Sequence, residues 1–209
     1  FFNFIDLKPG DMGEDTISLH VNNNDSWLCA DLSLTSNLDN TSTEPELEDG
    51  DTNVIIDPTG ELANKVKFIW WADDGDNVLE TCQGGTGQTG NCVSEIVLDM
   101  GPLSNLGVGA TTTVALAYAS GGIWGSSPVA GGSDRFIGKA WCFGTLNQTP
   151  VQQDELGKTN PNSNGPLSPR GPGVSCNGAG ENNTTQTDSM TVDVAFRAVQ
   201  SRNNPGFSC

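Results

Sequence analysis

Apolar and polar residues alternate over several segments of the chain, and Gly, Pro, Asn and Asp separate these segments. Alternation with a period of two is typical of β-strands, because successive side chains of a strand point to opposite faces of the sheet. The most regular segment lies near the C-terminus and places Asp193 and Arg197 opposite its apolar side chains. Those apolar residues are Met190, Val192, Val194, Phe196 and Ala198.

Other segments predict further strands of the same kind. The segment 16–21 alternates apolar residues with Thr16, Ser18 and His20. Residues 136–146 form a long candidate strand, and residues 92–100 form a less regular one. The remaining apolar stripes are Ile17, Leu19 and Val21; Leu28, Ala30, Leu32 and Leu34; Val66, Phe68 and Trp70; and Val114, Leu116 and Tyr118. Only residues 59–66 suggest a short helix.

Together these patterns predict an all-β fold. About seven or eight strands at irregular spacing, with no long amphipathic helix, are typical of a β-sandwich, here jelly-roll-like. A chain of 209 residues suits one such domain, so we expect a single domain over residues 1–209. Two long polar loops are expected at residues 35–53 and 147–189, and loops of this length are usually functional or tethered.

The six cysteines offer the tethers. An even number of dispersed cysteines without a C-x-x-C motif favours disulfides over a metal cluster. Cys82 and Cys92 bracket a Gly-rich stretch and predict a local bridge, and Cys142 with Cys176 would tie a strand to the second long loop. Elimination leaves Cys29 with Cys209, although the cysteines alone allow about 15 pairings.

Several features predict an exported protein. Disulfides form in oxidising compartments, and Asn-x-Ser/Thr sequons make glycosylation candidates of Asn24, Asn40, Asn147, Asn182 and Asn183. The chain starts at Phe1 without a Met or an apolar leader, so we expect that a signal peptide has been removed. No apolar run approaches the length of about 20 residues that a membrane-spanning helix needs.

The charge balance narrows the class of partner. There are 26 Asp and Glu against 9 Lys and Arg, which gives a net charge of −17. Binding to nucleic acid depends on clustered cationic side chains, so a nucleic-acid partner is not expected. Divalent cations fit this composition better, while solubility through self-repulsion is the simpler interpretation of the same charge.

Enzyme motifs are missing from the sequence. His20 is the sole histidine and lies on the polar side of its predicted strand, which leaves no H-E-x-x-H zinc site. No G-x-S-x-G nucleophile elbow occurs. The many carboxylates leave no specific pair to name as a glycosidase site. The sequence therefore predicts a protein without catalytic residues.

One acidic segment predicts a metal site. Asp73, Asp74, Asp76 and Glu80 surround Gly75 directly after a predicted strand. Oxygen-rich loops with a glycine at the sharp turn suit Ca²⁺, which takes about six to eight oxygen ligands. The spacing is not that of an EF-hand, and a solvated acidic hairpin is the alternative.

Two other candidates are weaker. The acidic run at residues 44–51 is interpreted as a solvated loop that could supply one or two distant ligands. Its carboxylates are Glu44, Glu46, Glu48, Asp49 and Asp51. Trp124 is the best candidate for an exposed sugar-binding platform, but a role in the core is the favoured interpretation. At least one of the adjacent Trp70 and Trp71 is expected in the core.

The chain begins with "FNFIDLKPGDMGEDTISLHVNNNDSWLCADL", which predicts strand, Lys-Pro-Gly-Asp turn and strand. This stretch, followed by "FIWWADDGDNVLE", "FIGKAWCFGTL", "QTDSM" and "AVQSRNNPGFSC", resembles TasA/camelysin-like secreted proteins, which are often exported with SipW-type signal peptides. The resemblance implies a β-sandwich or jelly roll and an extracellular, cell-surface or biofilm-matrix role. The camelysin label of metallopeptidase transfers poorly, because this chain lacks the zinc motif.

The resemblance also implies fibre formation, in which the N-terminal strand of one subunit completes a sheet of the next. The N-terminal segment 1–7 is very apolar, and its anchors would be Phe1, Phe2, Phe4, Ile5 and Leu7. Such a strand is an aggregation hazard when free and an effective ligand for an open sheet. We therefore expect a homopolymeric filament subunit. The alternatives are pairing of this strand within its own sheet, and a monomeric calcium-dependent surface adhesin or carbohydrate-binding module that recognises surface glycans.

Overall fold

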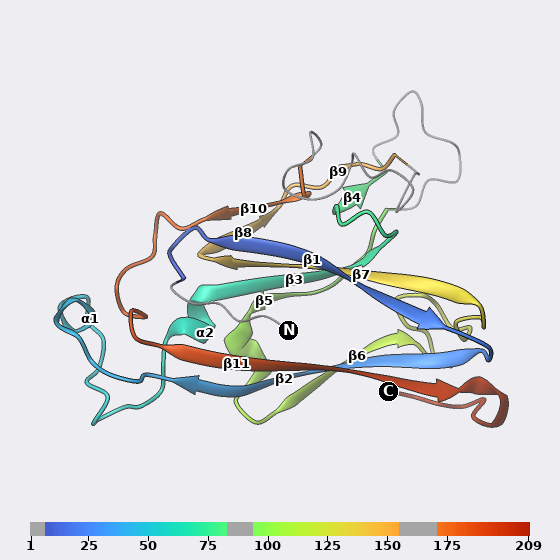
Figure 1. The fold of residues 1–209 in the computed structure, drawn as a ribbon, viewed down its shortest axis with the longest axis horizontal. Coiled ribbons are helices and arrows are strands. Elements are labelled where there is room, and N and C mark those ends of the chain that lie inside the picture. The colour runs from blue at the N-terminus through green and yellow to red at the C-terminus, as the bar shows by residue number, and fades with distance from the viewer. Residues whose placement is uncertain (1–6, 83–93, 155–170) are drawn as a thin grey trace.

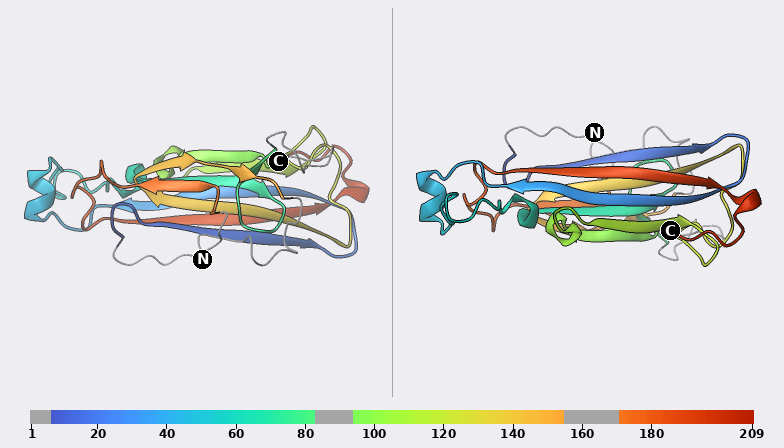
Figure 2. Two further views of the ribbon diagram at one scale, coloured as in Figure 1. Left: turned by 90° about the horizontal axis from the view of Figure 1, so that it is seen from above. Right: turned by 90° about the horizontal axis from the view of Figure 1, so that it is seen from below.

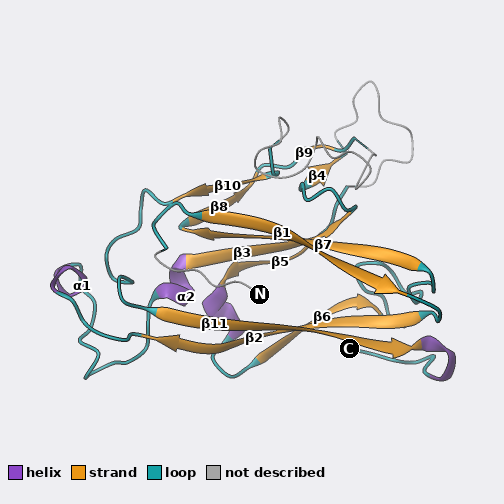
Figure 3. Ribbon diagram, in the orientation of Figure 1, coloured by secondary structure: helices purple, strands orange, loops and turns teal. Residues whose placement is uncertain are grey.

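The computed structural model describes residues 7–82, 94–154 and 171–209. Strands dominate, and the helices are short (Figure 3). The strands are β1 (Met12–Val21), β2 (Ser26–Leu38), β3 (Val66–Asp73), β4 (Glu80–Thr81), β5 (Val97–Pro102), β6 (Thr111–Ala117), β7 (Ser133–Phe143), β8 (Thr145–Gln148), β9 (Val151–Gln152), β10 (Val174–Asn177) and β11 (Ser189–Gln200). The helices are α1 (Glu44–Glu48), α2 (Leu62–Lys65) and the 3₁₀ turns η1 (Leu103–Leu106) and η3 (Ser201–Asn203).

Two antiparallel sheets pack face to face, which confirms the predicted all-β sandwich (Figure 1). One sheet has the strand order β1-β7-β3-β5, and the other has the order β11-β2-β6. The predicted stripes supply the core between them. Leu28, Ala30, Leu32 and Leu34 of β2 are all buried, and the apolar residues of β1 and β11 pack against the same cluster.

A third layer covers the outer face of the four-stranded sheet. Two small sheets, β8 with β10 and β4 with β9, lie above it in Figure 1. As a result β3 is buried on both faces: Phe68 and Trp70 join the main core, whereas Ile69 and Trp71 join a second apolar cluster. Both tryptophans of the Trp70–Trp71 pair are thus core residues.

Trp71 needs a glycine on the neighbouring strand. Gly138 of β7 pairs with Trp71, and a Cβ at Gly138 would lie 2.1 Å from the indole ring. Trp71 is 0% exposed, so its ring has no free space to move into. The expected result of Gly138→Ala is a loss of about 1–3 kcal/mol in unfolding free energy through overpacking, measured by denaturant titration. Gly180→Ala, where a Cβ meets nothing within 4 Å, is the matched control and should have little effect.

Two of the predicted disulfides are confirmed. Cys142 joins Cys176 with a Cα–Cα distance of 5.5 Å, and Cys29 joins Cys209 with a Cα–Cα distance of 5.8 Å. The first ties β7 to β10, and the second ties the C-terminus to β2. The predicted pairing of Cys82 with Cys92 lies outside the described residues.

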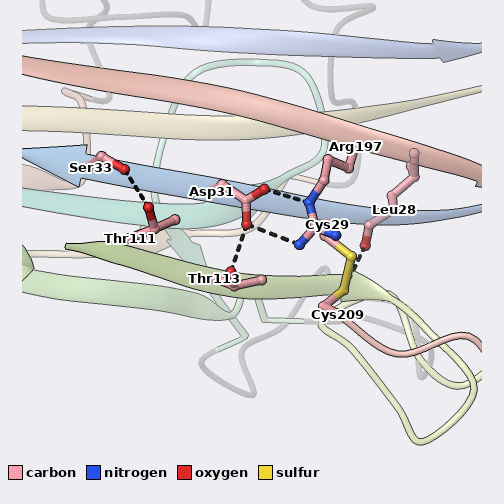
Figure 4. Close-up of polar contacts among 8 residues, drawn as sticks. All are labelled: Leu28, Cys29, Asp31, Ser33, Thr111, Thr113, Arg197 and Cys209. Atoms are coloured by element: carbon pink, nitrogen blue, oxygen red, sulfur yellow. Dashed lines mark hydrogen bonds and ion pairs between the residues drawn. A yellow bond between two sulfur atoms is a disulfide. The ribbon is translucent and has the colours of Figure 1, made fainter. Parts of the chain in front are cut away.

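Beside the C-terminal disulfide, polar contacts join the three strands of the smaller sheet on its outer face (Figure 4). The guanidinium of Arg197 on β11 binds both carboxylate oxygens of Asp31 on β2, and the Thr113 hydroxyl on β6 donates to Asp31 Oδ1 at 2.6 Å. These contacts hold the pKa of Asp31 below its usual value, mainly through the hydrogen bond from Arg197. The polar side of the β11 stripe thus links β11 to β2, and Asp31 in turn links β2 to β6.

The predicted turn at Lys-Pro-Gly-Asp is confirmed. The Asp11 N–H donates to the Lys8 carbonyl at 2.9 Å, and Gly10 has a φ of +93° that glycine adopts readily. Ahead of the turn, Leu7 packs against a small apolar cluster of its own chain, formed by Leu62, Val66 and Phe143. Phe1, Phe2, Phe4 and Ile5 lie outside the described residues.

Several predicted boundaries were wrong. The expected strand at 136–146 is two strands, because the chain turns at Gly144, whose φ is +135° and whose Cβ would lie 2.4 Å from the Asn177 carbonyl oxygen. The expected loop 35–53 contains the end of β2 and all of α1, and the expected loop 147–189 contains β9 and β10. The candidate strand at 92–100 becomes β5, which starts at Val97. The predicted short helix is present as α2.

Trp124 is not an exposed platform. It is partly buried and packs against the main core, and its backbone N–H donates to the Leu116 carbonyl at 2.8 Å. The favoured interpretation of a role in the core is therefore correct. The five sequon asparagines, in contrast, are all exposed, as glycan attachment requires. No helix of the described ranges has the length and apolar character needed to cross a membrane.

Candidate metal centre

The acidic turn after β3 forms a compact loop. Asp73 ends β3, and Gly75 and Asn77 have positive φ values of 108° and 64°, which let the chain reverse within a few residues. The Asp76 carboxylate accepts the Val78 N–H at 3.0 Å, as is common in turns that contain aspartate. The Asp76 side chain is thereby held against the backbone of its own turn.

Carboxylates from three segments converge at this turn. Three overlapping sets have ligand atoms within 4.8 Å of one another: Asp73, Asp74 and Asp76; Asp74, Glu80 and Glu95; and Asp76, Glu80 and Asp154. Calcium–oxygen distances are about 2.3–2.6 Å, so oxygens on opposite sides of one ion are about 5 Å apart. The spacing therefore suits a bound calcium ion. We refer to these six residues as the acidic centre.

The sequence predicted the first four members of the acidic centre but missed Glu95 and Asp154. Glu95 is placed by its own hydrogen bonds: its carboxylate accepts the Asp74 N–H at 2.8 Å and the Glu80 N–H at 2.9 Å. Asp154 is brought in by the parallel pairing of β9 with β4, which sets Val151 beside Glu80. Both residues lie far from the turn in sequence, so no local pattern marks them.

The edge strand β1 also contacts the acidic centre. The Thr16 hydroxyl lies 3.0 Å from Asp73 Oδ2 and 2.7 Å from Asn77 Oδ1. The Asn77 side-chain amide donates to Glu14 Oε1 at 3.3 Å. The acidic turn is thus attached to the first strand of the sandwich as well as to β4.

Burial makes this concentration of charge unfavourable without a cation. Asp76 and Glu80 are 0% and 1% exposed. Burial, followed by repulsion from neighbouring carboxylates, raises the pKa of Glu95 to about 10 and that of Glu14 to about 7. Burial also raises the pKa of Asp73 to about 6, against its hydrogen bonds from Thr16 and Asn77. Carboxylates as buried as these are stable only when they are protonated or lie next to a positive charge.

Two carboxylate oxygens test whether the acidic centre fits a bound cation. Asp73 Oδ1 and Glu14 Oε2 are buried and have no hydrogen-bond partner among the described residues. Buried polar atoms are normally paired, so orphaned oxygens beside a set of carboxylates point to a cation. The donors are all oxygens, which suits hard cations such as Ca²⁺ rather than zinc or copper.

The second acidic run is not the simple solvated loop that the sequence predicted. Glu44, Glu48 and Asp49 are exposed as expected, but Glu46 is 0% exposed and Asp51 is half-buried. The run forms α1, whose N-terminus has a capping box in which the Glu46 carboxylate accepts the Thr43 N–H at 2.6 Å. This signal, Thr followed three residues later by Glu, was readable in the sequence.

His20 lies on the open surface. Its Nδ1 is 2.7 Å from Asp134 Oδ1 and its Nε2 is 3.2 Å from Ser18 Oγ, the order of groups in a hydrolase triad. However, the imidazole is 59% exposed and Asp134 is 35% exposed, so water competes for each of these hydrogen bonds. Hydrolase triads act in sites that exclude water and stabilise an oxyanion. We assign no catalytic role to His20.

Comparison with known proteins gives no match to a family model, a curated protein or a solved structure. The functional assignment therefore depends on the geometry of the molecule itself, together with the sequence features described above.

Proposed function

We propose that this protein is a structural subunit of an extracellular filament, in which the N-terminal segment of one subunit completes the open side of the next. We further propose that calcium bound at the acidic centre stabilises the subunit, and that the protein is not an enzyme. The observation that carries the proposal is the side of the sandwich with the edge strands β1 and β11, each of which has only one strand neighbour among the described residues. We call it the open side.

The two edge strands lie on the same side of the molecule and run in the same direction (Figures 1 and 2). In the part of the chain that the structure describes, the only strand neighbour of β1 is β7, and that of β11 is β2. The edge strand β6 is instead covered by a loop: the Ile123 N–H donates to the Ala115 carbonyl and the Trp124 N–H to that of Leu116. Unpaired edges are normally protected, so two open edges side by side favour an intermolecular role.

A partly apolar groove lies at one end of this open side. Its volume is about 340 Å³ and it runs between the C-terminal halves of β1 and β11. The apolar lining residues are Leu19, Val21, Leu28, Phe196 and Ala198, and the polar ones are His20, Asn22, Asn23, Asn24, Ser26 and Gln200. A strand added at such an edge gains main-chain hydrogen bonds from the edge and side-chain contacts from the groove, as in β-strand addition.

The N-terminal segment supplies a suitable donor. Phe1, Phe2, Phe4 and Ile5 are apolar and closely spaced. Leu7 packs on its own subunit, so in this proposal Leu7 anchors the segment and the residues before it act in the neighbour. A contact from the start of one copy to the groove of another is heterologous, and such contacts generate open filaments unless their rotation closes a ring.

The expected location agrees with this role. The two disulfides indicate an oxidising compartment. We propose that the protein is exported with a cleaved signal peptide to the cell surface or the extracellular matrix, where exposed sequons can carry glycans. The resemblance to the TasA/camelysin-like proteins supports both the export route and the assembly.

A bulky charge in the groove should block assembly. Ala198 is exposed and lines the groove, so Ala198→Arg adds volume and charge there without removing a core side chain. We expect Ala198→Arg to remain soluble and discrete in negative-stain electron microscopy while the native protein forms filaments. Ala195→Arg is the matched control, since Ala195 is exposed on the other face of β11 and should leave filaments intact. Equal filament formation by both variants would place the contact elsewhere.

A monomeric calcium-dependent surface adhesin or carbohydrate-binding module is the second candidate. It is favoured by the acidic centre, because calcium sites in the loops of β-sandwiches can serve ligand binding as well as stability. Discrete particles of native protein that bind glycans only in the presence of calcium would support this function over the filament.

A further inference from the structure

A second group of carboxylates lies at the opposite end of the sandwich from the acidic centre, beside α1 (Figure 1). Asp39 directly follows β2, Glu46 lies in α1, and Asp51 follows α1. The ligand atoms of these three residues lie within 4.8 Å of one another. Two oxygens that bind one calcium ion are at most about 5 Å apart, so these separations are compatible with a shared ion.

Asp39 is the observation that distinguishes this group from a chance cluster. The side chain is 5% exposed, and neither carboxylate oxygen has a hydrogen-bond partner in the described ranges. Asp51 Oδ2 is also buried and unpartnered. Burial, and then the charges of Asp51 and Glu46, raise the pKa of Asp39. A contact from the Thr41 backbone that does not meet hydrogen-bond geometry opposes this rise in part. A buried carboxylate with two unsatisfied oxygens is costly unless it is protonated or bound to a cation.

Glu46 brings a fixed negative charge to the same place. Burial disfavours its ionised form, but hydrogen bonds from Thr43 and Thr187 outweigh this and lower its pKa. The Thr187 N–H donates to Glu46 Oε1 at 2.8 Å, and the Thr43 N–H donates to Oε2. The ionised form of Glu46 is therefore the stable one, and its charge lies within reach of Asp39 and Asp51.

Two further carboxylates, those of Glu61 and Asp188, lie close enough to the cluster to interact with its charges. Asp188 accepts the backbone N–H groups of Glu61 and Leu62 through Oδ2, while its Oδ1 and the Oε2 of Glu61 are buried without partners in the described ranges. Within those ranges no Lys, Arg or His forms an ion pair with any of these carboxylates, and the nearby Lys65 pairs with Glu181 at 2.9 Å. Among the described residues, no side-chain cation thus pairs with these carboxylates.

We propose that Asp39, Glu46 and Asp51 bind one calcium ion, at a site separate from the acidic centre. The donors are carboxylate oxygens, as Ca²⁺ prefers, and their positions on a strand end, a helix and a loop suit its flexible coordination better than the strict octahedron of Mg²⁺. The ion would connect the end of β2 to α1 and, through Thr187, to the start of β11. This site does not depend on the filament proposal.

Calorimetric titration of the full-length protein with CaCl₂ tests the site. Asp39→Asn keeps the shape of the side chain but removes its charge, and it should bind one calcium ion fewer than the native protein. Glu48→Gln is the matched control, because Glu48 lies exposed on the same helix outside the three ligands, and it should bind the native number. Asp76→Asn should lose binding at the acidic centre and keep the ion of this second site.

Asp39→Asn that binds as many calcium ions as the native protein would overturn the proposal and show that Asp39 is a protonated buried acid. If Asp39→Asn fails to fold, Asp51→Asn replaces it, because Asp51 is only half-buried. An unchanged number of bound calcium ions in Asp51→Asn would also contradict the proposed site. Filament formation is scored separately by microscopy, so loss of the second site and failure of the filament model remain distinct results.

Discussion

Removing calcium from the native protein should lower its melting temperature by about 5–10 °C. A ligand at 100 times its dissociation constant stabilises the folded state by about 2.7 kcal/mol, and about 1 kcal/mol shifts the melting temperature of a chain of this size by about 2–4 °C. The physical reason is the acidic centre, where buried carboxylates repel one another unless a cation lies between them. Scanning calorimetry before and after treatment with a chelating resin measures the shift.

Two substitutions distinguish the effect of calcium bound at the acidic centre from the effect of calcium elsewhere on the protein. Asp76→Asn preserves the hydrogen bond to the Val78 N–H but removes a charge, so it should abolish the part of the shift that comes from this centre. Asp193→Asn, on the exposed face of β11, should leave the shift unchanged. A melting temperature that is indifferent to calcium in the native protein would show that the turn is only an acidic hairpin.

The effect of calcium on the melting temperature should also depend on pH. The folded-state pKa values of Asp73, Glu14 and Glu95 are raised to about 6, 7 and 10, so the folded protein binds these protons more tightly than the unfolded chain. This contribution is fully present below the unfolded pKa values and is lost as the pH rises through the folded ones. Calcium-free protein should therefore become less stable as the pH rises from about 4 to about 10, and saturating calcium should remove or reverse that loss.

A variant that lacks residues 1–5 should fold and stay soluble but form no filaments. The missing residues include Phe1, Phe2, Phe4 and Ile5, and burial of each such side chain contributes roughly 1.5–3 kcal/mol. Without them, too little remains to offset the ordering and association costs of adding a subunit. Negative-stain microscopy, with calorimetry as a check on folding, measures the outcome.

A peptide of residues 1–7 provides the complementary experiment. Added to the truncated variant, it should bind with saturation, and a scrambled peptide of the same composition should not. Binding should be lost with Ala198→Arg in the groove and kept with Ala195→Arg on the other face of β11. Filaments formed by the truncated variant would contradict the donor role of the N-terminal segment.

The sequence predicted the parts of the fold that local periodicity determines. The stripes of β1, β2 and β11 lie in the core as expected, because alternation alone sets which face of a strand is buried. The third layer was not predicted, since β4, β9 and β10 are short and carry no usable periodicity. The burial of β3 on both faces follows from that layer, which is why Trp71 is as buried as Trp70.

The candidate sites also divide into residues that the local sequence marks and residues that only tertiary contacts bring together. The acidic turn at Asp73 to Glu80 is contiguous and was readable, whereas Glu95 and Asp154 join it only through tertiary pairing. Glu46 and Asp51 were interpreted as part of a solvated loop because charge runs usually are, and Asp39, which joins them in the structure, was not predicted. The burial of this cluster depends on the contact of Glu46 with Thr187, about 140 positions away in sequence and therefore invisible to any local pattern.

Electron cryo-microscopy of the native filament tests the central claim most directly. The proposal predicts density for residues 1–6 of one subunit along the open side of the next, paired with the exposed edge of β1 or β11 and with phenylalanine side chains in the groove lined by Leu19 and Phe196. Density that places residues 1–6 in the sheet of their own subunit, or native protein that remains as discrete particles, would contradict it.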